Sequence, residues 1–352
     1  MHSYFYNSKQ LLSLVIGGII FFTSCRKILL PIFKHGGSGN AHVFVAGYES
    51  NGTVNVAKYW VDGQEIQLSD GTNSAKANSI FVSNDAVYVA GFDDGAVYWK
   101  DNTEIRLSGP AANPYYESGN SIFVSSNDVY VAGGNVDSRA VYWKNGTEVL
   151  LDKTNVYGNS SSIANSVIVS GNDVYAAGND GNNAVYWKNG AEVYLTQLTS
   201  IYPELFHATS IYVSGGDVYV VGFETSAGTP FPQFLFWKNG VSVPINKPLD
   251  TYGPANSVFV SGSDVYIAGM QESTPSVIPT AAFWKNGNVT LLPRSEIYSF
   301  ANSIYVSGSD VYVAGYEEAA YPVNYAVYWK NGVEVKLTDG TQAAIATSIF
   351  VK

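Results

Sequence analysis

The stretch that decides the fold is ANSVIVSGNDVYAAGNDGNNAVYWKNGAEVYL, which spans Ala164–Leu195. Its β-rich runs are separated by turn residues, first at Ser170–Asp173 and later at Asn189 and Gly190. Asn-Gly between two such runs is the strongest short hairpin signal, because both residues tolerate the positive φ of a type I′ turn. The stretch therefore predicts four antiparallel strands, A to D. They are expected at Asn165–Val169, Val174–Gly178, Ala184–Trp187 and Glu192–Leu195.

This unit recurs seven times along the chain. The strand-C tryptophans of the copies are Trp60, Trp99, Trp143, Trp187, Trp237, Trp284 and Trp329. The glycines that end strand B give an independent count of seven: Gly47, Gly91, Gly133, Gly178, Gly222, Gly269 and Gly315. The tryptophans follow one another at about 45 residues, the length of a four-stranded repeat unit.

The two ends of the repeat region predict how the molecule closes. The first copy begins at strand B, His42–Gly47, and the chain stops after a strand A at Ala346–Val351. We expect the C-terminal strand to complete the N-terminal unit, because this pairing removes free strand edges.

The period and the four-stranded unit resemble the β-propeller superfamily over residues 41–352. This resemblance implies an all-β fold, a seven-bladed β-propeller whose C-terminal strand closes the N-terminal blade. The tryptophans are never followed by Asp, as WD repeats would require, and the Ser-Gly-x-Asp turns do not match the Asp-box of sialidase-like propellers. No narrower family, and no family activity, is implied.

The N-terminus predicts export and lipid anchoring. The apolar run Leu11–Phe22 is shorter than the roughly 20 residues that span a bilayer but suits a signal-peptide core. Thr23-Ser24-Cys25 resembles the lipobox of bacterial lipoproteins, and Cys25 is the single cysteine of the chain. We expect a signal peptide at 1–24, a lipidated Cys25 with a flexible tether at 25–40, and the propeller at 41–352. An ordinary cleaved signal with an incidental cysteine is the alternative.

Composition limits the partners. The 29 acidic and 19 basic residues give a net charge of −10, which repels a phosphate backbone, so nucleic acid is not expected to bind. A repeat that fills the mature chain leaves room for one domain, which we expect to be a monomeric propeller in the bacterial cell envelope, periplasmic or at the cell surface.

Residues found in every copy are interpreted as structural. Besides the tryptophans and the turns, these include an Asn-Ser or Thr-Ser pair that opens strand A. The pairs begin at Asn78, Asn120, Asn165, Thr209, Asn256, Asn302 and Thr347. Because strand A is the innermost strand of a blade, we interpret the pairs as a polar ring that hydrogen-bonds inner-strand backbone and water; a ligand site is the alternative.

The loops differ between the two faces of the predicted ring. The A-B and C-D turns are short and uniform, whereas the B-C and D-A loops on the other face vary in length, and variable loops on a rigid scaffold often carry function. Aromatic side chains in or beside the D-A loops are candidates for stacking on a sugar or anchoring a protein; packing at the mouth of the ring is the alternative. These candidates are Tyr116, Tyr202, Phe206, Tyr252 and Tyr298.

Carboxylates follow strand B in all seven copies. They are Glu49, Asp93, Asp137, Asp180, Glu224, Glu272 and Glu317. Such an acidic crown would attract a cationic partner or bind Ca²⁺ through oxygen ligands, whereas solvated turn residues explain each acid separately. No other metal or cofactor is expected.

No motif identifies a reaction, and no catalytic residue is assigned. His207 near Glu204, and Glu117 beside Tyr116, are specific to single copies and have side chains able to act as acid or base. The sequence favours an envelope lipoprotein whose propeller binds or scaffolds a glycan or an envelope protein through the variable face. The alternative is a carbohydrate-active enzyme, a glycoside hydrolase or lyase, that uses carboxylates in the funnel of that face.

Overall fold

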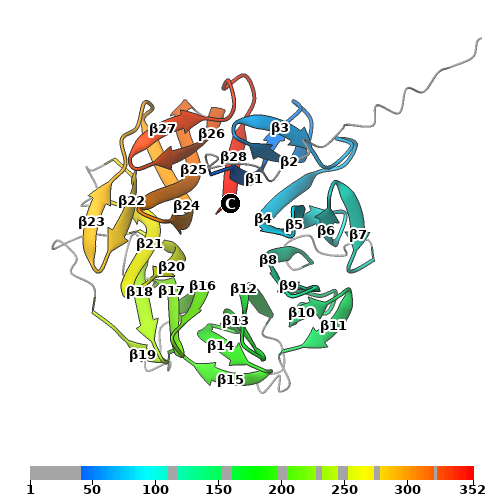
Figure 1. Ribbon diagram of the computed structural model, residues 1–352, viewed down its shortest axis with the longest axis vertical. Coiled ribbons are helices and arrows are strands. Elements are labelled where there is room, and N and C mark those ends of the chain that lie inside the picture. The colour runs from blue at the N-terminus through cyan, green and yellow to red at the C-terminus, as the bar shows by residue number, and fades with distance from the viewer. Residues whose placement is uncertain are drawn as a thin grey trace, which may run out of the picture. The chain divides into compact units, whose positions relative to one another are not determined.

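The computed structural model describes residues 41–109, 117–151, 161–196, 204–226, 232–244, 253–272, 278–320 and 323–352. All of them belong to the unit Gly37–Lys352, which is compact on its own; the other unit, Met1–Gly36, lies outside the described residues. The described residues form 28 strands in seven four-stranded antiparallel sheets, arranged as the blades of a ring (Figure 1). The predicted all-β, seven-bladed β-propeller is confirmed.

Each sheet is one blade, and its strands run in the order A, B, C and D from the axis outward (Figure 1). Blade 1 contains β28 (Ala344–Val351), β1 (Val43–Ser50), β2 (Asn55–Val61) and β3 (Gln64–Gln67). Blade 2 contains β4 (Ala75–Ser83), β5 (Ala86–Asp93), β6 (Ala96–Lys100) and β7 (Thr103–Arg106). Blade 3 contains β8 (Gly119–Ser125), β9 (Asp128–Gly134), β10 (Ala140–Lys144) and β11 (Thr147–Leu150). Blade 4 contains β12 (Ser162–Ser170), β13 (Asp173–Asp180), β14 (Asn183–Lys188) and β15 (Ala191–Tyr194). Blade 5 contains β16 (Leu205–Ser214), β17 (Asp217–Thr225), β18 (Gln233–Lys238) and β19 (Val241–Ser242). Blade 6 contains β20 (Ala255–Ser261), β21 (Asp264–Gln271), β22 (Thr280–Lys285) and β23 (Asn288–Leu291). Blade 7 contains β24 (Tyr298–Ser307), β25 (Asp310–Ala320), β26 (Val323–Lys330) and β27 (Val333–Lys336).

The ring closes between the two ends of the propeller, as predicted. Strand β28 pairs antiparallel with β1, from Val43 opposite Val351 to Glu49 opposite Ala344. Backbone hydrogen bonds between His42 and Lys352, of 2.7 and 3.0 Å, continue the pairing past the strands. In Figure 1 the red C-terminal strand therefore lies beside the blue first strand.

The C-D turns have the predicted type I′ character. Asn189 and Gly190 have φ angles of 50° and 76°, and the corresponding residues of the other six blades also have positive φ. Asp62-Gly63 and Asp101-Asn102 replace Asn-Gly in blades 1 and 2, which fits the tolerance of Asp and Asn for this region.

The strand-B glycine is required by a close backbone approach. At Gly315 a Cβ atom would lie 1.8 Å from the carbonyl oxygen of Phe300 in strand A, and across the seven blades this distance is 1.8 to 2.3 Å. Any side chain at this position would therefore push strands A and B apart.

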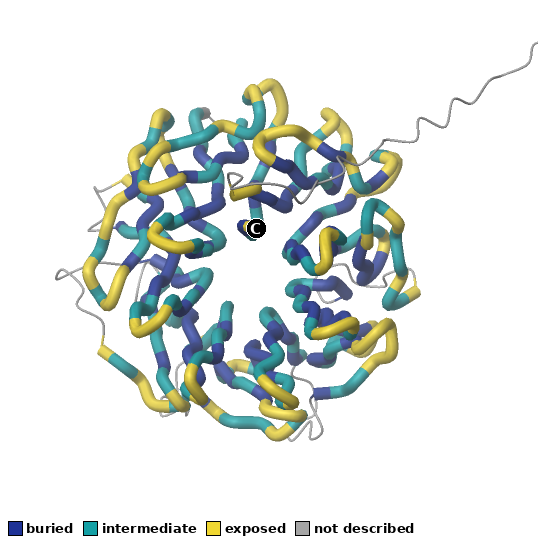
Figure 2. The backbone as a smooth tube through the Cα atoms, viewed as in Figure 1, coloured by how far each residue is buried: buried dark blue, intermediate teal, exposed yellow. Residues whose placement is uncertain are grey.

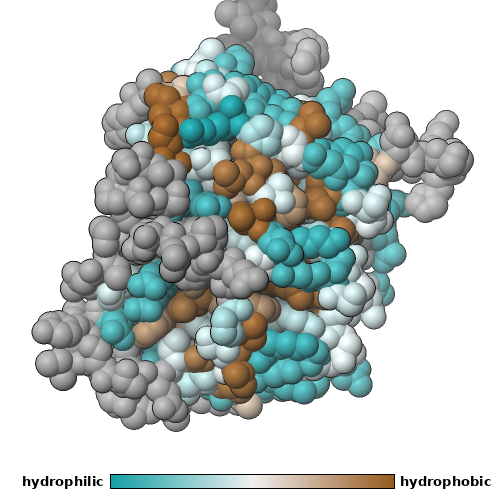
Figure 3. Space-filling model, turned by 90° about the vertical axis from the view of Figure 1, so that its left-hand side faces the viewer, coloured by the Kyte–Doolittle hydropathy of each residue, from teal (hydrophilic) through white to brown (hydrophobic). Residues whose placement is uncertain are grey.

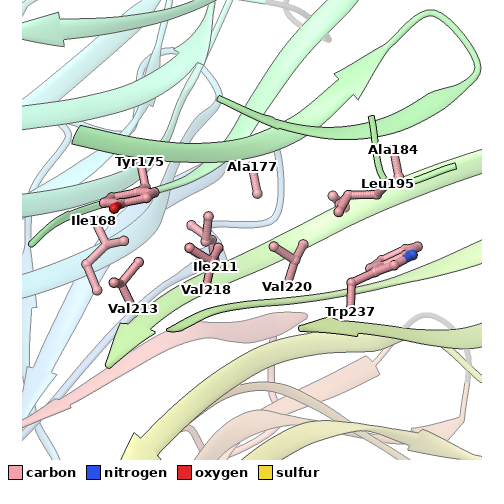
Figure 4. Close-up of a cluster of buried hydrophobic side chains, with 11 residues drawn as sticks. Ile168, Tyr175, Ala177, Ala184, Leu195, Ile211, Val213, Val218, Val220 and Trp237 are labelled. Carbon is pink, nitrogen blue, oxygen red and sulfur yellow. The ribbon is translucent and has the colours of Figure 1, made fainter. Parts of the chain in front are cut away.

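The core lies between adjacent blades. The seven tryptophans are at most 2% exposed, and those of blades 1 and 3 to 7 belong to apolar clusters between neighbouring sheets. Between blades 4 and 5, Trp237 packs with Tyr175 and Val220 in a cluster that also includes Ile168 and Ile211 (Figure 4). Buried residues concentrate in the inner and middle strands, and exposed residues at turns and outer strands (Figure 2). On the side of the ring that carries blades 5 and 6, apolar residues form small groups among hydrophilic ones (Figure 3).

A closed ring of side-chain hydrogen bonds joins the inner strands. The Asn or Thr of each strand A donates to a backbone carbonyl of the next blade at 2.6 to 3.1 Å, for example Asn120 to Ala164 and Thr347 to Ala77. The following serine accepts a backbone N–H of the next blade at 3.1 to 3.3 Å. The predicted role of these pairs in binding inner-strand backbone is confirmed. In every blade the Asn or Thr is the extra residue of a β-bulge.

Aromatic side chains of strand A form a collar around the axis. Five neighbouring ring pairs have centroid separations of 4.8 to 5.0 Å, and Ile168 occupies the equivalent position in blade 4. The collar consists of Phe123, Phe81, Phe350, Tyr305, Phe259 and Tyr212. The offset, tilted geometry is that preferred by aromatic pairs, so the collar adds cohesion at the inner ends of the blades.

Closure gives the first prediction. Deleting residues 346–352 removes the paired strand of blade 1 together with the Thr347 hydrogen bond to Ala77 and the Ser348 hydrogen bond to Ile80. We expect a loss of several kcal/mol of unfolding free energy, on the order of 1 kcal/mol for each net hydrogen bond plus the lost apolar burial. Thermal unfolding followed by circular dichroism measures it. A midpoint within about 2 °C of wild type would contradict the closure.

Candidate functional site

One face of the propeller is uniform from blade to blade. In blade 3, Asp128 accepts hydrogen bonds from Lys144 at 2.8 Å and from Asn145 at 2.8 Å, and the Lys144 ammonium lies 5.3 Å from the centre of the Tyr130 ring. The donors Lys144 and Asn145 hold the pKa of Asp128 below its usual value. The same four-residue arrangement occurs in blades 3 to 7. Its repetition indicates a structural role for these turns.

The opposite face departs from this symmetry inside the strands as well as in the loops. The residue after the strand-B glycine and its partner on strand A differ from blade to blade. By register the pairs are Tyr48 with Ile345, Phe92 with Lys76, Asn179 with Ile163, Phe223 with His207, and Tyr316 with Phe300. His207 was already singled out from the sequence as specific to a single copy. Most of the other residues were not, because they lie inside strands and their only signal is variation within an otherwise regular repeat.

A pocket of about 620 Å³ lies on this variable face, where blades 2 and 3 meet. It is lined by Asn73, Ser74, Lys76, Asn78, Phe92, Asp94, Ser118 and Asn120. Two of its amides are fixed by the inner hydrogen-bond ring: Asn78 donates to Ser118 and to the Gly119 carbonyl at 2.9 and 3.0 Å, and Asn120 donates to the Ala164 carbonyl. The inner wall of the pocket is therefore preorganised.

Aromatic groups continue from this pocket across blades 1 and 7. The Lys76 ammonium lies 5.0 Å from the centre of the Tyr48 ring. In blade 7, Phe300 and Tyr316 stack at 4.6 Å. Burial, followed by the charges of Glu318 and Tyr48, raises the pKa of Tyr316 to about 12, so its hydroxyl stays protonated near neutral pH.

His207 is a packed side chain of blade 5. Its ring stacks on Phe223 at 4.6 Å, and its Nδ1 lies 3.2 Å from the Asn179 amide nitrogen. Burial lowers the pKa of His207, so the ring is neutral near pH 7 and Nδ1 accepts the amide hydrogen. Glu117, the other blade-specific group, is fully buried.

The structure describes only some of the aromatic residues that were predicted to bind a ligand. Tyr116, Tyr202 and Tyr252 lie outside the described residues. Phe206 is half-buried and packs against the apolar cluster between blades 4 and 5. Tyr298 begins β24 of blade 7 and is 37% exposed.

The acids that follow strand B have different surroundings. Lys58 bridges Glu49 at 2.6 Å and Glu65 of strand D at 2.9 Å. Glu317 is fully buried and accepts hydrogen bonds from the backbone and hydroxyl of Ser295.

The remaining members of the predicted crown range from buried to exposed. Glu272 is buried, Asp93, Asp180 and Glu224 are half-buried, and Asp137 is exposed. Tyr194 donates to Asp180 at 3.2 Å. Within the described ranges no three His, Cys, Asp or Glu side chains form a group able to hold a metal ion.

Among these acids, Asp93 of blade 2 has a strongly perturbed carboxyl. Burial, then the nearby negative charge of Glu104, raises the pKa of Asp93 to about 6, while the positive charge of Arg106 opposes the shift. A hydrogen bond between Asp93 and Glu104 adds to the same upward shift. In blade 3 the equivalent contact is made by an amide, since Asn135 donates to Glu148 at 3.0 Å.

Comparison with known proteins supports the fold alone. No family profile and no curated protein matches the sequence. Among solved structures, the chain is similar to a puromycin-hydrolysing peptidase of Mycobacterium tuberculosis at 10% identity and a TM-score of 0.50, covering 85% of this chain and 52% of that one.

Two propeller domains give lower scores. The β-propeller domain of the Trilobed protease from Pyrococcus furiosus matches at 12% identity, with a TM-score of 0.48 and coverage of 86% and 96%. The WD40 β-propeller domain of Doa1 matches at 16% identity, with a TM-score of 0.43 and coverage of 77% and 85%. Within the part of the chain that the structure describes, no helix is long and apolar enough to cross a membrane.

The raised pKa of Asp93 gives the second prediction. Between pH 4 and 6 the folded state holds a proton that the unfolded state has lost, so stability falls as pH rises through this window and the cost remains above it. Asp93→Asn should therefore stabilise the protein at pH 7.5, by no more than about 1 kcal/mol because solvent screens a half-buried group, and should have little effect at pH 4. Thermal midpoints at the two pH values measure it.

The exposed Asp137→Asn serves as the control and should leave the midpoint unchanged at both pH values. A lower midpoint for Asp93→Asn at pH 7.5 would show that the ionised carboxylate is required in the fold.

Proposed function

We propose that the protein is a lipid-anchored protein of the bacterial cell envelope whose propeller binds a glycan or an envelope protein through its variable face. The observation that carries this proposal is the pocket of about 620 Å³, which falls in the size range of ligand sites. It lies on the face where strands and loops depart from sevenfold symmetry. β-Propellers commonly serve binding or scaffolding roles.

The chemistry of the pocket fits a polar ligand. Amide and hydroxyl groups of Asn73, Ser74 and Ser118 offer hydrogen-bond donors and acceptors, and Phe92 offers an apolar ring surface. The two amides held by the inner ring keep their orientation before a ligand arrives, which reduces the entropy cost of binding.

Lipid anchoring rests on sequence, since Cys25 and the tether lie outside the described residues. The multiple acyl chains of a bacterial lipoprotein would hold the propeller to a membrane, and Gly36-Gly37-Ser38-Gly39 would let it reach a partner.

A carbohydrate-active enzyme is the second candidate, and the Asp93 carboxyl is the observation that favours it. A pKa of about 6 suits a general acid. However, Asp93 is in hydrogen-bond contact with Glu104, closer than the roughly 5 to 9.5 Å that separates paired carboxyls in glycoside hydrolases, and Glu104 lies on the outermost strand. Hydrolysis or cleavage of a bound oligosaccharide, lost in Asp93→Asn, would establish the enzyme.

The use of the variable face gives the third prediction. Glycan-array and pull-down screening with residues 41–352 identifies a ligand. Alanine at Tyr116, Tyr202, Phe206, Tyr252 or Tyr298 should then weaken its binding by about 1 kcal/mol or more at one or two positions, because a minority of contacts usually dominates. Titration calorimetry measures each affinity after the melting temperature has been checked.

Matched substitutions on the uniform face serve as controls. Lys188→Ala and Lys285→Ala remove ion pairs to Asp173 and Asp264 and should leave ligand affinity unchanged. Full affinity in all five aromatic variants, or loss only in the lysine variants, would refute the assignment to the variable face.

The anchor gives the fourth prediction. Cys25→Ala should abolish acyl labelling and release the propeller from the membrane fraction with an unchanged melting temperature, because Cys25 precedes every strand that the structure describes. Mass spectrometry of the mature N-terminus and membrane fractionation provide the readout. A wild-type protein without lipid, whose N-terminus is a residue other than Cys25, would contradict the anchor.

A further inference from the structure

We propose that the pocket between blades 2 and 3 binds an acidic glycan, with a sugar ring on Phe92 and the sugar's anionic group at the Lys76 ammonium. This inference rests on the proposed function and specifies its ligand. It is carried by the side chains that line the pocket and by the difference between Lys76 and the equivalent residues of the other blades.

The neutral polar side chains of the pocket match sugar hydroxyls. Five of the eight lining residues are Asn or Ser. The Asn78 and Asn120 amide nitrogens donate to backbone carbonyls of the next blade, so the carbonyl oxygens of these two side chains remain as acceptors at fixed positions. A sugar hydroxyl both donates and accepts hydrogen bonds, and the Asn and Ser side chains of the lining offer both acceptors and donors.

The positive charge of the pocket has no carboxylate partner within the described ranges. Lys76 is half-buried and forms a cation-π contact with Tyr48, but it forms no ion pair there. By contrast, the lysines of the uniform face in blades 3 to 7 each pair with an aspartate. The Lys76 ammonium would donate a charge-assisted hydrogen bond to an anionic group of the ligand.

The fold does not require a lysine at this position. The equivalent strand-A residues that pair with strand B are Ile345, Ile163, His207 and Phe300, and the blades that carry them are built in the same way. Because none of these residues is a lysine, the site occurs once in this set of blades. We therefore expect one acidic ligand per propeller.

Phe92 and Asp94 complete the recognition of a sugar. Phe92 lies directly across from Lys76 in the β4-β5 pair, so a ring stacked on its face brings a substituent of that ring toward the ammonium. Asp94 is exposed, where solvent screens its charge, and its carboxylate accepts hydrogen bonds from sugar hydroxyls.

Titration calorimetry with matched oligosaccharides tests the inference. The probes are a galacturonic acid trisaccharide, the same trisaccharide with its carboxyls reduced to alcohols, and a sulfated galactose oligosaccharide with its desulfated counterpart. At least one acidic probe should bind at a stoichiometry of one, roughly tenfold or more tighter than its neutral counterpart, the gain expected of a hydrogen bond to a charged group. The two acidic probes distinguish a carboxylate from a sulfate ester.

Two lysines of blade 2 provide the variant and its control. Lys76→Gln should abolish the preference for the acidic probe while leaving the weaker binding of the neutral probe. Lys100→Gln should retain the full preference, since Lys100 also lies over a tyrosine ring, Tyr88 at 5.3 Å, but at the end of β6 on the uniform face. Phe92→Ala should weaken both probes. Each variant is first shown to keep the wild-type melting temperature.

The outcomes separate this inference from the proposed function. Equal affinity for acidic and neutral probes, an unchanged preference in Lys76→Gln, or no binding of either acidic probe would overturn the inference. The five aromatic alanine variants of the third prediction are measured with the ligand that the screen identifies. They test whether the variable face binds that ligand, independently of these results.

Discussion

The structure depends on the hydrogen bonds that link each inner strand to the next blade. Strand A is an edge strand, and its backbone groups on the side of the axis have no strand partner within their own sheet. Side chains supply that partner: Asn120 binds the Ala164 carbonyl, and Ser121 accepts the Val167 N–H. The ring contains fourteen such bonds, two for each blade. At about 1 kcal/mol net for each bond, their sum is comparable with the total stability of an ordinary domain.

This linkage makes several repeated residues interdependent. The bulge at each Asn or Thr turns its side chain toward the neighbouring blade, and in the same segment the carbonyl of the residue two positions earlier lies against strand B. In blade 7 these residues are Asn302 and Phe300, and the carbonyl of Phe300 approaches Gly315 so closely that a Cβ atom there would clash. The Asn, the bulge and the glycine are therefore one structural device, which explains why they recur together. Strand β28 is needed both for its pairing with β1 and because Thr347 and Ser348 supply the bonds that close the ring.

The sequence predicts those features whose cause is local. Turn type follows from Asn189-Gly190, blade number from the tryptophan repeat, and closure from the unpaired strand at the C-terminus. Features that depend on contacts between residues far apart in the chain could not be predicted from the local sequence. The collar from Phe81 to Phe350 joins residues far apart in the chain, and nothing near Phe81 specifies that contact. The acids show the same limit. In blade 1 a strand-B acid and a strand-D glutamate share Lys58, and in blade 2 the charge of the strand-D Glu104 helps to raise the pKa of Asp93, so neither acid could be understood from its turn alone.

At the mouth of the ring, the sevenfold repetition also distinguishes residues that the fold requires from residues that it does not require. The inner hydrogen-bond ring makes the blades rigid with respect to one another, so a side chain that differs in one blade is held at a fixed position without being needed for the fold. The positions equivalent to Lys76 in blades 4 and 1 are occupied by Ile163 and Ile345, so an apolar side chain is compatible with the fold at this place in strand A. The lysine at position 76 lies 5.0 Å from the centre of the Tyr48 ring and forms no ion pair within the described ranges. Because folding does not account for the charge of Lys76, the interaction that accounts for it is to be sought in a ligand of opposite charge.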